Sequence, residues 1–210
     1  KNIFKNLGCK LVDIELPNAS LGVAAYYIIA PAECSSNLAR FDGVKYGYRA
    51  DESENLDLLY KNTRSEGFGA EVKRRILIGT YALSAGYYDK YYEQAQKVRA
   101  VIKNDFNTAF AKVDIILGPT TPTTAFPLKK MGRNDPTELY NSDLYTIPVN
   151  LAGLPAISIP VGFCKEGLPI GMQLIGRAFN ESILLNTAHQ FQLHSEWHLK
   201  TPKFIESLDE

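Results

Sequence analysis

The feature that most constrains the fold is a pair of apolar segments, AISIPV over residues 156–161 and PIGMQLI over residues 169–175. Both are short and apolar, and the Lys-Glu-Gly sequence over residues 165–167 between them is typical of a hairpin turn. A further buried strand is expected over residues 114–117, where DIIL is closed by Gly-Pro. Because short strands bury their faces against helices, the chain is predicted to be part of a layered α/β fold.

Apolar residues at helical spacing predict the helices that cover these strands. The clearest begins near residue 89, and its apolar stripe consists of Tyr91, Ala95, Val98, Ile102, Phe106 and Ala109. Another follows Gly69, and its segment 76–85 is apolar almost all round, which predicts burial on all sides. Asn180 is predicted to cap a final helix, whose inward residues are Ile183, Leu184, Thr187, Ala188 and Phe191.

The remaining segments have weaker patterns. Residues 11–16 alternate apolar and acidic side chains, which predicts a half-buried strand. Ser20 is expected to cap a helix that breaks or restarts at Pro31 and reaches residue 40. Residues 41–69 are expected to be loop with a short helix at 56–60, and residues 119–127 an ordered loop. One or two short helices, interrupted by Pro148, are expected over residues 137–150.

Composition excludes several classes of protein. The 23 Lys and Arg residues balance 23 Asp and Glu residues, which argues against a stand-alone nucleic-acid binder. No run approaches the eighteen apolar residues of a membrane span, so no membrane partner is expected. The three cysteines lack C-x-x-C spacing, which favours a reduced, cytoplasmic chain. The first residue is not Met, and the strands are few for the helices, so a piece of a longer protein is expected.

Several chemistries lack their motifs. There is no G-x-S-x-G elbow, no P-loop and no Rossmann glycine fingerprint. His194 and His198 are four residues apart, but Ser195 stands where a zinc metalloprotease has Glu, so a solvated helix end is favoured over a metal site. Cys34 has no histidine in its half of the chain to act as a base, so a packed small residue is favoured there.

Two charged residues are candidates for ligand binding. Arg75 ends a run of three cations that opposes the helix macrodipole, and it shares a helical face with Gly79, Ala82 and Gly86. An inward arginine requires an anion, which is either a buried carboxylate or a ligand. Asp143 is either a helix cap or the partner of a cationic ligand group, and Tyr26 is most simply a core aromatic residue.

A resemblance to a known family adds to these alternatives. Residues 148–176 resemble the C-terminal signature of the amidase-signature enzymes. Residues 33–46 and 66–106, with their Arg-Phe-Asp-Gly and Lys-Arg-Arg runs, resemble the A subunits of the glutamyl-tRNA(Gln) amidotransferases within that family. The resemblance implies that residues 1–210 are the C-terminal part of a single amidase domain, an α/β/α sandwich around a mixed sheet whose N-terminal half is missing.

The resemblance also implies a function for the complete protein. It would hydrolyse glutamine with a Ser–cis-Ser–Lys triad and pass ammonia to a partner subunit, which amidates Glu-tRNA(Gln) with ATP and Mg²⁺. The expected partners are glutamine, the B and C subunits and, through the complex, misacylated Glu-tRNA(Gln). Ser35 and Ser36 lack the flanking glycines of the triad segment, so no catalytic residue, metal ligand or cofactor site is expected here, and the segment alone is expected to be inactive.

Three residues match substrate-binding positions of these subunits. Arg75 matches the arginine that binds the α-carboxylate of glutamine, Asp143 the aspartate that receives the α-ammonium group, and Tyr26 a tyrosine that lines the pocket. Two alternatives are a non-catalytic binding or scaffold module and a fragment of an amidase of broader specificity.

Overall fold

The computed structural model describes residues 1–51, 53–127 and 142–202. The chain divides into two compact units, Lys1–Val23 with Arg99–Glu210, here called the sheet unit, and Ala24–Val98, here called the helical unit. The prediction that residues 1–210 form one part of a single domain stays a prediction.

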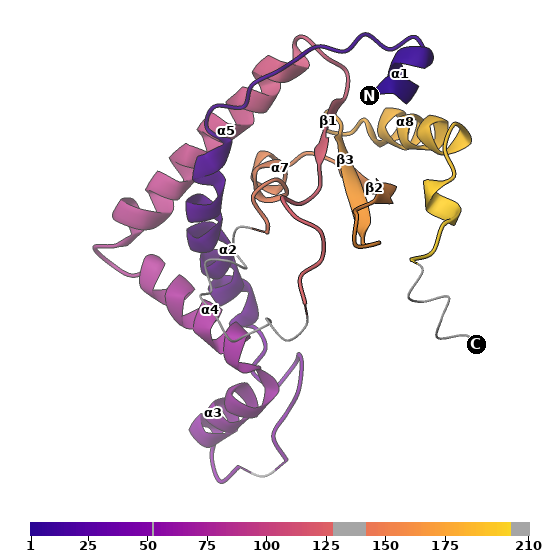
Figure 1. Ribbon diagram of the computed structural model, residues 1–210. Helices are drawn as coiled ribbons and strands as arrows, with labels where there is room; N and C mark the ends of the chain where they lie inside the picture. The colour runs from indigo at the N-terminus through magenta and orange to yellow at the C-terminus, as the bar shows by residue number, and fades with distance from the viewer. Residues whose placement is uncertain (52, 128–141, 203–210) are drawn as a thin grey trace, which may run out of the picture. The chain divides into compact units, whose positions relative to one another are not determined.

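The sheet unit contains three strands, β1 (Ile116–Pro119), β2 (Ala156–Phe163) and β3 (Pro169–Ile175), shown in Figure 1. Their order is β1-β3-β2, and β3 pairs antiparallel with both neighbours. The tight turn between β2 and β3 is closed by a 2.9 Å bond from the Cys164 amide to the Leu168 carbonyl. Gly167 has φ +80° in this turn, a conformation that glycine adopts at no steric cost. The predicted hairpin is therefore confirmed.

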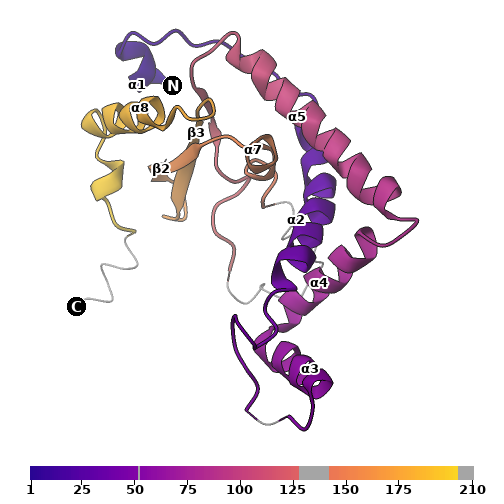
Figure 2. The ribbon, with the colours of Figure 1, turned by 180° about the vertical axis from the view of Figure 1, so that it is seen from behind.

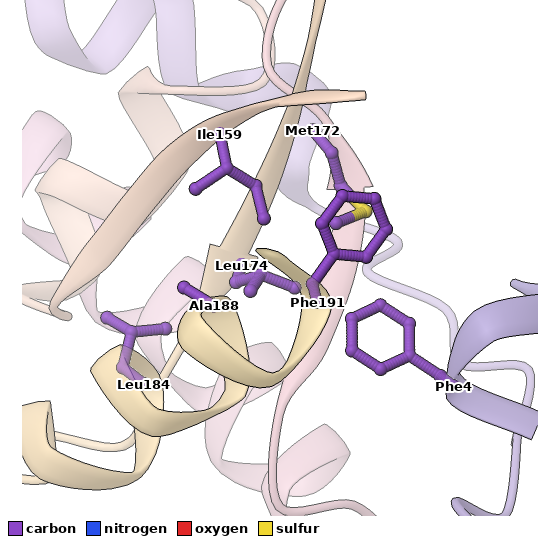
Figure 3. Close-up of a cluster of buried hydrophobic side chains, with 7 residues drawn as sticks. All are labelled: Phe4, Ile159, Met172, Leu174, Leu184, Ala188 and Phe191. Atoms are coloured by element: carbon purple, nitrogen blue, oxygen red, sulfur yellow. The ribbon is translucent and has the colours of Figure 1, made fainter. Parts of the chain in front are cut away.

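Helix α8 (Glu181–Leu193) covers one face of this sheet, as Figure 2 shows from behind. The buried side chains of α8 lie three or four residues apart and so share one face of the helix. Met172 and Leu174 of β3 lie two residues apart and so point to the same face of the sheet, towards α8. The ring of Phe4 in α1 (Asn2–Asn6) packs against that of Phe191, with the two ring centroids 5.7 Å apart and the rings tilted by 32°. Figure 3 shows the resulting cluster, which consists of Phe4, Ile159, Met172, Leu174, Leu184, Ala188 and Phe191.

The rest of the sheet unit connects this core to its helices. The predicted amphipathic helix is α5 (Gln94–Phe110), and Ile102 and Phe106 on its stripe are buried. The Asp105 carboxylate accepts bonds of 2.8 and 3.0 Å from the backbone and side-chain amides of Asn18. A short helix, α7 (Ile147–Ala152), ends at Gly153, whose φ of +70° is left-handed.

The helical unit contains most of α2 (Gly22–Leu38), all of α3 (Leu56–Gly67) and α4 (Ala70–Ala82), and a π-helical turn, η2 (Asp89–Glu93). Helix α3 begins where the Asn55 side chain accepts a 2.9 Å bond from the Leu58 amide. Helix α4 starts after Gly69, as predicted.

Some predictions for helix ends and interiors are wrong. Pro31 does not break α2, because this proline is buried in a close contact with α4 that offsets the roughly 3 kcal/mol cost of proline inside a helix. Ser20 is not a cap, since it lies within the short helix η1 (Ala19–Leu21) that leads into α2. Asn180 occupies the N-cap position of α8 without a side-chain capping bond. Pro148 lies in the first turn of α7, where its missing amide costs nothing, and does not interrupt it.

Some predictions of strands and of buried faces are also wrong. Residues 11–16 have no strand structure and are largely exposed, because no neighbouring strand pairs with them in the described part of the chain. Strand β1 begins two residues later than predicted, and α3 extends well beyond residue 60. Helix α4 is not buried all round, since Leu77 is 71% exposed, and Ile183 of α8 is exposed as well. No described helix combines the length and apolarity needed to cross a membrane.

Candidate functional site

The candidate site lies in the helical unit, where α2 and α4 approach closely. A Cβ atom added to Gly79 of α4 would overlap the Pro31 carbonyl of α2 and lie 2.8 Å from the Ser35 Cβ. Only glycine permits this approach, because any side chain would meet backbone that cannot move aside. One helical turn before Gly79 stands Arg75, and the close approach brings its side chain to α2.

Arg75 is held by one residue from each helix. Its Nε donates to the Glu71 carboxylate at 2.9 Å, and its Nη1 donates to the Tyr26 hydroxyl at 3.5 Å, the long end of hydrogen-bond range. The side chain is 33% exposed. The hydrogen bond with Tyr26 raises the pKa of Arg75 above its ordinary value, although partial burial acts in the opposite direction. The group is therefore a permanent, half-buried cation.

The Nη2 group of this guanidinium donates no hydrogen bond to any residue in the described ranges. The guanidinium has five N–H donors in a planar fork, and Glu71 occupies only the Nε edge. Glu71 is half-exposed, so the buried carboxylate proposed as one alternative is not what Arg75 contacts here. Among the described residues, the outer Nη edge carries only the long contact with Tyr26, so it retains N–H donors for a carboxylate.

The other cations of the run have their own partners. Lys73 Nζ donates to the Ser65 carbonyl at 3.0 Å, and Arg74 forms an ion pair with Glu71. Both side chains are exposed and have partners of their own, so they form a solvated basic turn. The contact of Glu71 with Arg75 was not predicted, although a spacing of four residues is the usual signal for a helical ion pair.

Tyr26 is not a simple core residue. It is half-buried, its ring meets Tyr27 edge-on at 5.0 Å, and its hydroxyl faces Arg75. Nearby, the Ser35 and Thr80 hydroxyls are bonded to each other at 2.8 Å. The structure thus brings together two of the three predicted binding residues, Arg75 and Tyr26.

Asp143 lies in the sheet unit, in the turn that precedes α7, and is half-buried. Its backbone carbonyl accepts bonds from the amides of Thr146 and Ile147 at 3.1 and 3.0 Å. The N-cap residue of α7 is Thr146, so the Asp143 carboxylate is not the helix cap that one alternative expected. Its Oδ1 accepts a 3.5 Å contact from the Ser142 hydroxyl.

Two further candidates from the sequence are His194 and Cys34. His194 is exposed at the end of α8, with Nδ1 2.9 Å from the Gln190 carbonyl, and Cys34 is half-buried with a free thiol. Within the described ranges, no three His, Cys, Asp or Glu side chains are grouped so that they could hold a metal ion.

The fold is thus α/β, with a helix-covered antiparallel hairpin, and its candidate site is a half-buried cation that suits an anionic group. The chain belongs to the Amidase family, whose match covers residues 1–185.

Similarity to curated proteins points to one group within this family. The chain is 59% identical over 200 residues to the A subunit of a glutamyl-tRNA(Gln) amidotransferase from Vesicomyosocius okutanii, covering 95% of this chain and 41% of that protein. It is 60% identical over 199 residues to the protein of the same name from Pseudomonas aeruginosa, with the same two coverages. The chain therefore spans about two fifths of the length of these relatives.

Two solved structures of amidase-type proteins also match the fold of this chain. The crystal structure of the A subunit of the Thermotoga maritima glutamyl-tRNA(Gln) amidotransferase matches with a TM-score of 0.60 and 42% identity, over 87% of this chain and 34% of that one. A crystal structure of an amidase matches with a TM-score of 0.66 at 21% identity, over 92% of this chain and 39% of that one, which shows the fold alone.

Proposed function

We propose that this chain is the part of a glutaminase A subunit that binds the amino-acid end of glutamine. Arg75 binds the α-carboxylate through its Nη edge, Asp143 receives the α-ammonium group, and Tyr26 lines the pocket and orients the guanidinium. The observation that carries the proposal is the half-buried Arg75 guanidinium, which is bonded at Nε and in long contact at Nη1, while its Nη2 donates to no residue in the described ranges. The names and identities of the relatives support an A subunit of a glutamyl-tRNA(Gln) amidotransferase.

The physical reason is selectivity for a zwitterion. Hydrogen bonds to charged groups contribute about 1.5–3 kcal/mol each, so two of them discriminate an α-amino acid from a simple amide. A guanidinium binds a carboxylate with two parallel N–H donors, which lysine cannot supply. The raised pKa of Arg75 keeps this donor set charged across the accessible pH range.

For the complete protein we propose an amidotransferase activity on glutamyl-tRNA(Gln), the class that its relatives' names print. Glutamine is hydrolysed, and its ammonia is used with ATP and Mg²⁺ in a partner subunit to amidate Glu-tRNA(Gln). The partners are the B and C subunits, and the complex works in the cytoplasm. We expect residues 1–210 to bind no cofactor and to supply no nucleophile, because Ser35 and Ser36 lack the flanking glycines of the triad segment. The isolated segment is therefore expected to be inactive.

The test is Arg75→Ala in an amidase of the relatives' full length that carries this segment. Loss of one charge-assisted contact is expected to raise the KM for glutamine about 10- to 100-fold. Lys73→Ala is the matched control, since this cation of the same run donates to the Ser65 carbonyl at 3.0 Å, and it should leave KM within about twofold. Unchanged KM and kcat in Arg75→Ala would contradict the proposal.

The two alternatives give different results in simple measurements. A scaffold module would exist as a mature chain of 23.4 kDa, which an intact-mass measurement on the source protein detects. An amidase of broader specificity would release ammonia from a simple aliphatic amide as readily as from glutamine.

A further inference from the structure

We infer that Glu71 is a positioning residue, which holds the Arg75 guanidinium so that a substrate carboxylate can approach only its outer Nη edge. The inference rests on the proposed function, because it concerns the same substrate group. Glu71 itself does not touch the substrate and acts through Arg75.

The geometry of the guanidinium carries the first step. A carboxylate can pair with an arginine side-on, through Nε and one Nη, or end-on, through both Nη groups. The Glu71 Oε1 accepts from Nε at 2.9 Å, so the side-on edge is already occupied. The Tyr26 hydroxyl lies 3.5 Å from Nη1, on the side of α2. These two contacts therefore leave the end-on approach, through both Nη groups, for a substrate carboxylate.

The place of Glu71 in the helix carries the second step. It lies in the first turn of α4, where the helix macrodipole favours a carboxylate, and its second oxygen accepts from Arg74. Two arginines therefore hold the carboxylate from two sides. A carboxylate restrained in this way limits the rotamers of Arg75 before a substrate arrives.

Restraining Arg75 in the unbound protein reduces the conformational entropy that this side chain loses when the substrate binds. An arginine loses rotamer freedom when it binds, at a cost of about two- to tenfold in affinity for each immobilised side chain. With Glu71 present, part of this freedom is already lost in the unbound protein. Loss of this restraint should weaken the binding only of ligands that contact Arg75. A general loss of folding would instead affect every substrate.

The experiment compares two amides in the full-length protein, glutamine and 4-aminobutanamide, which keeps the amine and the amide but lacks the α-carboxylate. Glu71→Ala is expected to raise the KM for glutamine about two- to tenfold, with kcat within twofold and no change in KM for 4-aminobutanamide. Glu71→Gln keeps an oxygen acceptor for Nε and should recover part of the loss. In an Arg75→Ala background, Glu71→Ala should have no further effect.

Glu93→Ala is the matched control. Glu93 pairs with Lys97 at 3.2 Å with the same spacing of four residues and nearly the same exposure as Glu71, but it does not contact Arg75. It should leave both KM values unchanged.

The outcomes separate the two proposals. If Arg75→Ala raises the KM for glutamine while Glu71→Ala does not, the positioning role is overturned and the proposed function stands. The positioning role is also overturned if Glu71→Ala affects both amides equally, or if its effect adds fully to that of Arg75→Ala. If Arg75→Ala changes nothing, both proposals fail.

Discussion

The cluster under α8 consists of apolar side chains, whereas the contact between α2 and α4 is surrounded by polar ones. The cluster in the sheet unit is wholly apolar, and Leu174 at its centre is 0% exposed. The contact in the helical unit is made by a glycine against a proline carbonyl, with Ser35, Thr80, Tyr26 and Arg75 beside it. Packing alone would favour apolar residues in both places, and the proposed binding of a ligand carboxylate accounts for the polar set.

The two regions also differ in energy. Each large apolar side chain in the cluster contributes about 1.5–3 kcal/mol on burial. Half-exposed ion pairs such as that of Glu71 and Arg75 contribute about 0–1 kcal/mol, since solvent screens them. Substitutions in the first region should therefore change stability, while those in the second should chiefly change substrate binding.

The largest effect is expected for Leu174→Ala. Removing a completely buried leucine leaves a cavity, so the free energy of unfolding should fall by about 2–5 kcal/mol in a denaturant titration. Leu185→Ala on α8 is the control, because Leu185 is 58% exposed and its loss should cost less than about 0.5 kcal/mol. Equal losses in the two variants would mean that the cluster is not the core of this unit.

The next effect is expected for Gly79→Ala. The new methyl group would overlap the Pro31 carbonyl, so the helices must separate, at a cost of about 1–3 kcal/mol in the free energy of unfolding. Separation would also move Arg75 away from Tyr26, so the full-length protein should show a raised KM for glutamine. Gly118→Ala is the control, since an added Cβ there meets nothing within 4 Å. A stability gain in Gly79→Ala would contradict the close contact.

Features that depend on residues close together in the sequence could be predicted, whereas contacts between residues far apart in the sequence could not. The hairpin, α8 and the stripe of α5 follow from periodicities and turn residues within a few positions. The continuation of α2 through Pro31 could not be predicted, because it depends on Gly79, which is distant in sequence. The pairing of Arg75 with Tyr26 joins residues 49 positions apart, and only the family resemblance pointed to both.

The smallest effect concerns a tyrosine cluster that no sequence argument singled out. Tyr81, Tyr87 and Tyr91 have ring centroids 4.4–6.2 Å apart, and a hydrogen bond with Tyr87 raises the pKa of Tyr81 to about 12. Because the folded state holds this proton more tightly than the unfolded one, the stabilisation is complete below pH 10 and is lost as the pH rises towards 12.

The titration can be followed by NMR of ¹³C-labelled tyrosine rings. One ring should titrate near pH 12, and Tyr87→Phe should return it towards the ordinary value of 10.0. Tyr46→Phe, at an exposed tyrosine outside the cluster, should leave it unchanged. A Tyr81 ring that titrates at 10.0 in the unaltered protein would show that the cluster does not form.

The central claim is that the polar contact of the helical unit receives the carboxylate of glutamine. The most direct measurement is a crystal structure of the full-length amidase with an unreactive glutamine analogue bound. We expect both carboxylate oxygens within about 2.7–2.9 Å of the Arg75 Nη groups, with Glu71 still bonded to Nε and the ammonium group at Asp143. A carboxylate bound away from Arg75, or a guanidinium that has released Glu71 to bind it side-on, would contradict the account.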